Sequence, residues 1–458
     1  MNISRPDAAS FRDPDGFVFY RDGELYRQVN QAYQADFDQL MTSGLYDELV
    51  QRELLVAHET ADPDLSVTDE AFRILKPEAV PFVSYPYEWS FSQLRDAALT
   101  TLTIQRKALA AGMSLKDASA YNIQFLRGRP LLIDTLSFER YREGQPWIAY
   151  RQFCEHFLAP LAVMSYTDVR LGRLLQVYMD GIPLDLAARL LPFRARLSFS
   201  ILTHIVLHAR SQRRYAGADI GSLKHKMSLH ALTLLIDNLE GAIGRLRWRP
   251  RETGWTDYYR STNYSSEARR HKERLVERFV RQVEPSQIWD LGANTGLFSR
   301  AASHNGALTV AFDMDPSVVE RNYRECVRNG EKNILPLLLD LTNPSPDCGW
   351  DNRERKSLLK RSPCELAMAL ALIHHLAIAN NIPLDLVARF LGGICRWLII
   401  EFVPKSDSQT QRLLASREDI FPRYTSSGFE EAFGKVFSVH ARERIEGSQR
   451  TLYLMKKR

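Results

Sequence analysis

Residues Ile288–Phe298 read IWDLGANTGLF, and this stretch decides how the second half of the chain folds. An apolar run ends in an acid and is followed by Gly-x-x-x-Gly and then by the residues of a helix start. Gly292 and Gly296 permit positive φ and a close approach of the main chain to a ligand. The helix that follows offers its N-terminus to a polar or anionic group. The stretch therefore predicts a strand, a sharp turn and a helix beside a binding site.

Further apolar runs follow this turn, and each ends in polar residues. They are Leu308–Phe312 before Asp313, Ile334–Leu339 before Asp340, and Leu366–Ile373 before His374 and His375. Asp313 comes roughly 20 residues after the glycines, where an acid can accept hydrogen bonds from both ribose hydroxyls. Successive strands that all finish in polar residues predict a crevice at one edge of a sheet.

The spacing of the glycines distinguishes between two kinds of ligand. A dinucleotide-binding turn has Gly-x-Gly-x-x-Gly, in which the second glycine leaves room for a pyrophosphate. Asn294 stands at that position here, and its side chain would obstruct a pyrophosphate. The same side chain can hydrogen-bond an amino-acid carboxylate or ammonium, so the turn favours a ligand of that chemistry.

With this turn, the two later acids and the two histidines, the chain from about Tyr258 onward resembles a class I S-adenosylmethionine-dependent methyltransferase. The resemblance implies an α/β fold with a seven-stranded Rossmann-like sheet, in which one strand is antiparallel. It also implies S-adenosylmethionine as the cofactor and methyl transfer to an oxygen, nitrogen or carbon nucleophile. The implied cofactor-binding residues are Asp290, Gly292, Asn294, Gly296, Asp313 and Asp340, with Asp340 receiving the adenine amino group.

His374 and His375 are the catalytic candidates of this interpretation. In such folds they stand beside the methyl group, and a histidine can take a proton from an attacking hydroxyl or amine near neutral pH. Adjacent residues at a strand end point in opposite directions, so at most one of the two faces the acceptor. The sequence leaves open which one does.

Two other segments are expected near the site. The polar stretch 343–355 is interpreted either as an insertion over the acceptor side or as a surface loop, and its substrate-side candidates are Trp350, Asn352 and Arg355. In the resembled family the residues before the first strand help to close the cofactor site. That implies lining roles for Tyr258, Tyr264 and Lys272.

The first half of the chain predicts a mostly helical α+β domain. Gly16–Val29 has the pattern of a hairpin, whereas Gln34–His58 and Phe91–Ala111 carry apolar residues at helical spacing. Asp117, Asn122 and Asp134 stand in the order that protein-kinase-like catalytic loops use for a hydroxyl acceptor and Mg²⁺. The usual His-Arg, the Gly after the second Asp and the glycine-rich loop are missing. Three interpretations stay open: a Mg-ATP phosphotransferase, a degenerate kinase-like or substrate-docking module, and residues that only cap turns.

Composition limits the remaining possibilities. The chain of 458 residues predicts two domains, 1–244 and 256–458, with a basic linker over 245–255. The chain has no signal-peptide pattern and no apolar run of the ~20 residues that span a bilayer, which favours the cytoplasm and no membrane partner. Five scattered cysteines predict no metal site, and a net charge of +5 does not indicate nucleic acid.

The acceptor, a small molecule or a macromolecule, stays open. The whole chain resembles a two-part bacterial methyltransferase family with nodulation-protein-like members.

Overall fold

The computed structural model describes residues 5–209, 227–252, 265–304, 306–415 and 417–458. The chain divides into two compact units, Met1–Arg249 with Asp347–Arg355, and Pro250–Pro346 with Lys356–Arg458. The first boundary falls inside the predicted linker, whereas the sequence does not predict that residues 347–355 belong to the first unit. Tyr258 and Tyr264 lie outside the described residues.

In its described part, the N-terminal unit contains a five-stranded antiparallel sheet with the strand order β1-β2-β3-β5-β4. Its strands are β1 (Arg5–Pro6), β2 (Gly16–Arg21), β3 (Glu24–Asn30), β4 (His58–Thr60) and β5 (Ala71–Pro77). The predicted hairpin is confirmed as β2 and β3. The helical pattern over Gln34–His58 does not form one continuous helix. It is broken at Gly44, which has φ 75°, into α1 (Gln34–Thr42) and α2 (Leu45–Gln51), and His58 begins a strand.

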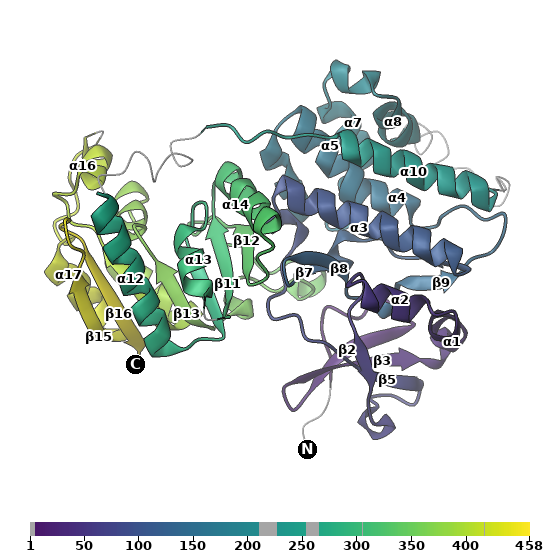
Figure 1. The fold of residues 1–458 in the computed structure, drawn as a ribbon, viewed down its shortest axis with the longest axis horizontal. Coiled ribbons are helices and arrows are strands. Elements are labelled where there is room, and N and C mark those ends of the chain that lie inside the picture. Colours follow the sequence, from purple (N-terminus) through teal and green to yellow (C-terminus); the bar gives the residue numbers. More distant parts are fainter. Residues whose placement is uncertain (1–4, 210–226, 253–264, 305, 416) are drawn as a thin grey trace. The chain divides into compact units, whose positions relative to one another are not determined.

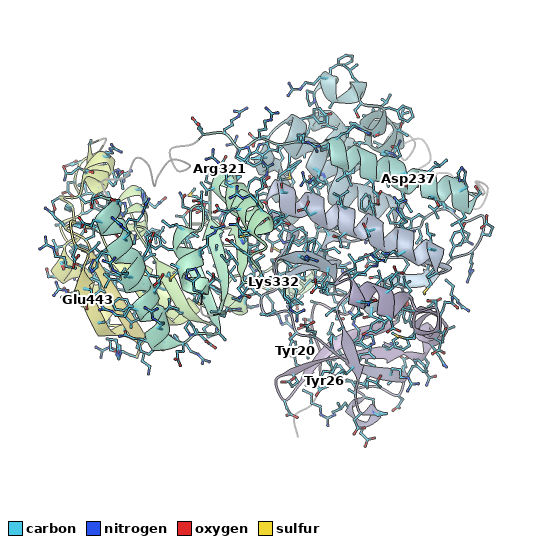
Figure 2. All side chains as sticks on the ribbon, viewed as in Figure 1. Tyr20, Tyr26, Asp237, Arg321, Lys332 and Glu443 are labelled. Atoms are coloured by element: carbon cyan, nitrogen blue, oxygen red, sulfur yellow. The ribbon has the colours of Figure 1, made fainter. Side chains whose placement is uncertain are left out.

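The long helix α3 (Phe91–Ala110) confirms the helix predicted after residue 91. Ser90 and Gln93 cap its N-terminus reciprocally, each accepting a hydrogen bond from the other's amide. α3 packs against α10 (Leu229–Arg245), where Arg106 donates to Asp237 at 2.7 Å and to Glu240. Figure 2 labels Asp237 on α10. The other elements are β6 (Met113–Leu115), β7 (Ile123–Leu126), β8 (Arg129–Leu132), β9 (Phe138–Arg140), α4 (Tyr150–Phe153), α5 (Ala159–Tyr166), α6 (Leu174–Val177), α7 (Leu184–Leu190) and α8 (Phe199–Ile201).

The C-terminal unit is built on a seven-stranded mixed sheet in its described residues, with the order β12-β11-β10-β13-β14-β16-β15 (Figure 1). Its strands are β10 (Gln287–Leu291), β11 (Leu308–Asp313), β12 (Ile334–Leu338), β13 (Cys364–Ala369), β14 (Cys395–Phe402), β15 (Phe437–Arg444) and β16 (Thr451–Lys457). β16 runs antiparallel to both of its neighbours, and the other pairs are parallel. The implied sheet with one antiparallel strand is therefore present.

Successive side chains of a strand point to opposite faces of the sheet. Apolar side chains of this sheet point to both faces, and helices cover both. On one face, Leu454 belongs to a buried cluster that includes Phe279 of α12 and Phe298 of α13. On the other face, the ring of Tyr453 lies 5.1 Å from that of Phe429 on α17. The helices of the unit are α12 (Ser266–Val283), α13 (Leu297–Ser303), α14 (Pro316–Asn329), α15 (Leu384–Ile394), α16 (Ser408–Leu414) and α17 (Ser426–Gly434).

Candidate functional site

The predicted strand, turn and helix around the two glycines are present as β10, a tight turn and α13. Gly292 (φ 77°), Asn294 (φ 52°) and Gly296 (φ 82°) all have positive φ. The amides of Gly292 and Ala293 both donate to the carbonyl of Phe312, at 2.9 and 2.8 Å, which ties the turn to the end of β11. The main chain is therefore held at the carboxyl edge of the sheet.

The two glycines serve different purposes. Gly292 lines a cavity, whereas Gly296 precedes α13 and is not among the residues that line it. A Cβ at Gly296 would lie 2.4 Å from Oδ1 of Asn322 on α14, so a larger residue cannot fit there without a shift. The requirement for glycine at 296 thus comes from its positive φ and from the packing of α14 against it.

The cavity, of about 240 Å³, lies within the C-terminal unit at the carboxyl ends of the parallel strands. It brings together most of the predicted site residues, namely Asp290, Gly292, Asn294, Asp313, Asp340 and His375. Its other polar lining residues include Arg269, Lys272, Thr342 and Asn380, and its apolar ones include Phe298, Met314, Leu341, Leu370, Leu372 and Leu376. Basic groups from α12 and acidic groups from the strand ends therefore line one cavity.

The acidic groups are held by hydrogen bonds from neighbouring residues. Asp313 accepts from the amides of Asn294 and Asp315, both at 2.9 Å. Asp290 accepts from the hydroxyl of Ser299 at 2.6 Å. Burial raises the pKa of Asp290 and that of Asp313 to about 6. Both carboxyl groups consequently titrate closer to neutral pH than an exposed aspartate does.

The third acid, Asp340, follows β12 and caps its own turn. Its Oδ1 accepts from the amide of Thr342 at 2.9 Å and from the hydroxyl of Thr342 at 2.6 Å. Asp313, the last residue of β11, and Asp340, just after β12, therefore stand at the ends of adjacent strands and line the same cavity.

A buried network of charges lies behind the cavity. Lys272 donates to Oε2 of Glu401 at 2.5 Å, and the amide of Ala371 donates to the same oxygen at 2.9 Å. Arg450 donates to Oε1 of Glu401 at 3.2 Å and forms two hydrogen bonds with Asp407. The sequence does not predict the part played by Arg450. The signal that could have revealed it is a lone acid, Glu401, inside an apolar strand, since a buried charge requires a partner.

The structure distinguishes between the two histidines. The strand predicted over Leu366–Ile373 is wrong at its end: β13 stops at Ala369, and His375 begins the π-helix η13 (His375–Ala379). His375 lines the cavity, whereas His374 is fully buried and does not. Their ring centres lie 4.1 Å apart. Burial lowers the pKa of His375 to about 4, so this ring is neutral near pH 7.

The three substrate-side candidates of the 343–355 stretch lie in a hairpin that belongs to the N-terminal unit. The amide of Cys348 donates to the carbonyl of Arg355 at 3.0 Å and closes this hairpin. Glu354 accepts two hydrogen bonds from Arg12, at 2.6 and 3.0 Å. The guanidinium of Arg355 lies 4.3 Å from the ring centre of Tyr121. The described residues that line the cavity do not include Trp350, Asn352 or Arg355.

The residues of the kinase-like pattern gather within the N-terminal unit. Asn122 donates to the hydroxyl of Ser137 at 3.3 Å, and Ser137 donates to Asp134 at 2.7 Å. Asp134 also forms an ion pair with Arg27 of β3. Burial raises the pKa of Asp117. Across the ranges that the structure describes, no three His, Cys, Asp or Glu side chains are grouped so as to hold a metal ion.

Comparisons with known proteins place the chain in a family. No protein-family model matches it. Over 454 residues it is 37% identical to the nodulation protein NoeA of Rhizobium meliloti (strain 1021), covering 97% of this chain and 95% of the relative. Among the described helices, none is long and apolar enough to cross a membrane.

Two solved structures are similar over part of the chain. The magnesium protoporphyrin IX methyltransferase of Synechocystis PCC 6803, solved with bound SAH, matches 44% of this chain and 98% of its own, with 14% identity and a TM-score of 0.31. The bifunctional kinase-methyltransferase WbdD matches 47% of this chain at 16% identity and a TM-score of 0.30. The match spans 45% of the WbdD chain, less than half of its length. On the strength of its full-length similarity, the chain belongs to the family of the nodulation protein NoeA.

Proposed function

We propose that the C-terminal unit binds S-adenosylmethionine in the cavity and transfers its methyl group to an oxygen, nitrogen or carbon nucleophile of an acceptor. The observation that carries this proposal is the joint placement of Gly292, Asp313 and Asp340 in one cavity at the carboxyl ends of adjacent parallel strands. That arrangement suits a nucleoside, because carboxylates accept from ribose hydroxyls and from an amino group, and a glycine admits the ligand close to the main chain.

The chemistry of the lining residues fits the rest of this cofactor. Asn294 lines the cavity where a dinucleotide fold has a glycine, which favours a single nucleoside. Arg269 and Lys272 supply positive charge for a carboxylate, and Asp290 supplies an acceptor for an ammonium. The apolar side chains of Leu370, Leu372 and Leu376 exclude water from the remaining surface.

The bound cofactor would supply a methyl group already activated on a sulfonium. The residues of the chain therefore have to align the acceptor and desolvate it. His375 is the acceptor-side candidate. Its low pKa keeps the ring neutral, so a ring nitrogen can accept a hydrogen bond from an acceptor hydroxyl or amine and can take its proton as the new bond forms.

Calorimetric titration of the full-length protein with S-adenosylhomocysteine tests the proposal. We expect one-to-one binding in the micromolar range, and Asp313→Ala should weaken it strongly because the ribose acceptor is lost. Asp419→Ala is the matched control, since Asp419 is an exposed acid of the same unit that pairs with Lys405. Absence of binding at millimolar ligand, or unchanged affinity in Asp313→Ala, would contradict the assignment.

A second candidate function belongs to the N-terminal unit, as a Mg-ATP phosphotransferase. The observation in its favour is the hydrogen-bonded chain from Asn122 through Ser137 to Asp134. The test is the thermal unfolding midpoint of the full-length protein with and without Mg-ATP. A rise in the midpoint that disappears in Asp134→Asn would support a phosphotransferase, with each protein compared with its own ligand-free midpoint. No stabilisation by Mg-ATP would leave the unit with the role of a non-catalytic docking module.

A further inference from the structure

Three large apolar side chains of the N-terminal unit project into solvent within a short segment. Phe193, Leu197 and Phe199 are 76%, 75% and 72% exposed. Phe193 and Leu197 delimit the 3₁₀-helix η8 (Phe193–Leu197), and Phe199 begins α8. Single exposed apolar side chains are common on protein surfaces, but three of this size within the segment 193–199 indicate an interaction. We call the residues Phe193–Phe199 the apolar turn.

The apolar turn already has an inner face that packs against the unit. Ala195 within it is fully buried, and Leu191 and Ile201 on either side of it are 3% and 1% exposed. The small residue therefore points inward, and the two phenylalanines and the leucine point outward. Core packing favours the opposite arrangement, because burying a phenylalanine removes more apolar surface from water than burying an alanine. The outer side chains are available to a partner.

Positive charge accompanies the apolar side chains. Arg194 is exposed, and its guanidinium donates to the carbonyl of Tyr166 at 3.0 Å. Arg196 donates to the carbonyl of Ala188 at 3.2 Å. Carbonyl acceptors carry no net charge, so these two bonds do not themselves neutralise the guanidinium charges. A partner that presents both an apolar interior and negative charge would complement this segment.

From this combination we infer that the apolar turn docks on the surface of an anionic phospholipid bilayer. Phe193, Leu197 and Phe199 enter the boundary between headgroups and acyl chains, while the exposed Arg194 binds lipid phosphate. A fluid bilayer accommodates side chains that protrude from a convex turn, whereas a protein partner would need a matching pocket for each of them. Figure 1 shows α7 and α8, which flank η8, at the periphery of their unit.

This inference revises the sequence-based expectation of no membrane partner. That expectation rested on the absence of an apolar run long enough to span a bilayer. Docking on a surface needs only a few exposed side chains, and their exposure is a property of the fold. The inference is also independent of the proposed methyl transfer, because none of these residues lines the cavity of the C-terminal unit.

Co-sedimentation of the full-length protein with lipid vesicles tests the inference. Vesicles of phosphatidylcholine mixed with phosphatidylglycerol should bind the protein, and vesicles of phosphatidylcholine alone should bind it much more weakly. The triple variant F193S/L197S/F199S should lose at least about tenfold in partition. Arg194→Gln should weaken binding to the anionic vesicles and flatten its decrease with salt.

The matched control is V327S/I420S/V439S, which removes apolar side chains that are 55%, 60% and 49% exposed in the C-terminal unit. It should bind anionic vesicles like the unaltered protein. Equal thermal midpoints of the two triple variants and equal affinity for S-adenosylhomocysteine would show that both are folded. No binding to anionic vesicles, or equal binding by F193S/L197S/F199S, would overturn the inference. If the unaltered protein does not bind vesicles but self-associates, and F193S/L197S/F199S does not self-associate, the apolar turn would instead be an interface with a second copy of the chain.

Discussion

Nζ of Lys272 lies 2.5 Å from Oε2 of Glu401, and the two side chains are 3% and 0% exposed. Lys272 comes from α12 and lines the cavity, whereas Glu401 lies near the carboxyl end of β14, an interior strand of the sheet. The ammonium also lies 4.4 Å from the ring centre of Phe298. The pair therefore ties α12, which carries the cavity-lining Lys272, to β14 of the sheet.

Removal of one partner of this pair should destabilise the C-terminal unit. Glu401→Gln leaves Lys272 buried without its carboxylate and Arg450 paired with Asp407 alone. Breaking a buried pair on one side costs about 3–5 kcal/mol. The midpoint of denaturant unfolding measures this loss. Lys405→Met is the control, because its partner Asp419 is 45% exposed, and an exposed pair contributes about 1 kcal/mol or less. Equal effects of the two substitutions would contradict the buried role.

Ligand binding should depend on the ionisation of Asp313. Its raised pKa of about 6 means that the carboxyl is increasingly protonated below this pH, and a protonated carboxyl loses acceptors for ribose hydroxyls. The affinity for S-adenosylhomocysteine should therefore decrease as pH falls below about 6. Calorimetry at several pH values checks this, and Asp313→Asn should bind weakly with a flatter profile.

The same pKa has the opposite consequence for the stability of the ligand-free protein. An acid whose pKa is higher in the folded than in the unfolded chain stabilises the fold below the unfolded pKa of about 4. That contribution is lost as pH rises through about 6. Asp313→Asn should remove this part of the pH dependence, whereas the part from Asp290 stays. An unfolding profile that Asp313→Asn leaves unchanged between about pH 4 and pH 6 would argue against the raised pKa of Asp313.

His374→Leu should leave stability unchanged or raise it, by up to about 1–3 kcal/mol. Both ring nitrogens of His374 are buried without a hydrogen-bond partner among the described residues, and such groups cost free energy on folding. Thermal unfolding measures this effect, and a clear loss of stability in His374→Leu would show that the imidazole has a structural role.

His375→Leu should instead lower the rate of methyl transfer once an acceptor is identified, with little effect on cofactor affinity.

Glu354→Ala should release the hairpin 347–355 from the N-terminal unit. The Glu354 side chain is 2% exposed and accepts from Arg12 and from the amide of Trp350. Burial alone would raise the pKa of Glu354, but the hydrogen bonds from Arg12 and from the amide of Trp350 outweigh it and lower the pKa. The carboxylate is therefore favoured in the fold, and this contribution is lost at acidic pH. Faster amide hydrogen exchange over 347–355 is the expected signature.

The control for this hairpin is Arg353→Ala. Arg353 pairs with Asp351 in the same segment, but their side chains are 68% and 62% exposed. Because exposed pairs contribute little, exchange over the hairpin should stay as it is in the unaltered protein. If both substitutions accelerate exchange equally, Glu354 is not the residue that holds the hairpin.

The features that the sequence predicts correctly are those that neighbouring residues control. The turn at Gly292 follows from glycine spacing after an apolar run, and α3 follows from the helical periodicity of its apolar residues. Errors occur where a local pattern was extended too far. The helix over 34–58 breaks at Gly44, and β13 ends at Ala369, although apolar residues continue beyond both points.

By itself, the sequence determined the succession of strands along the C-terminal unit, because side-chain alternation, glycine turns and short connections are local properties. Only the tertiary structure decided that His375 and not His374 lines the cavity, that Arg450 meets Glu401, and that residues 347–355 belong to the N-terminal unit. It also decided that Phe193 is exposed. Burial and pairing depend on residues that are distant in the chain, and periodicity along the sequence carries no record of those contacts.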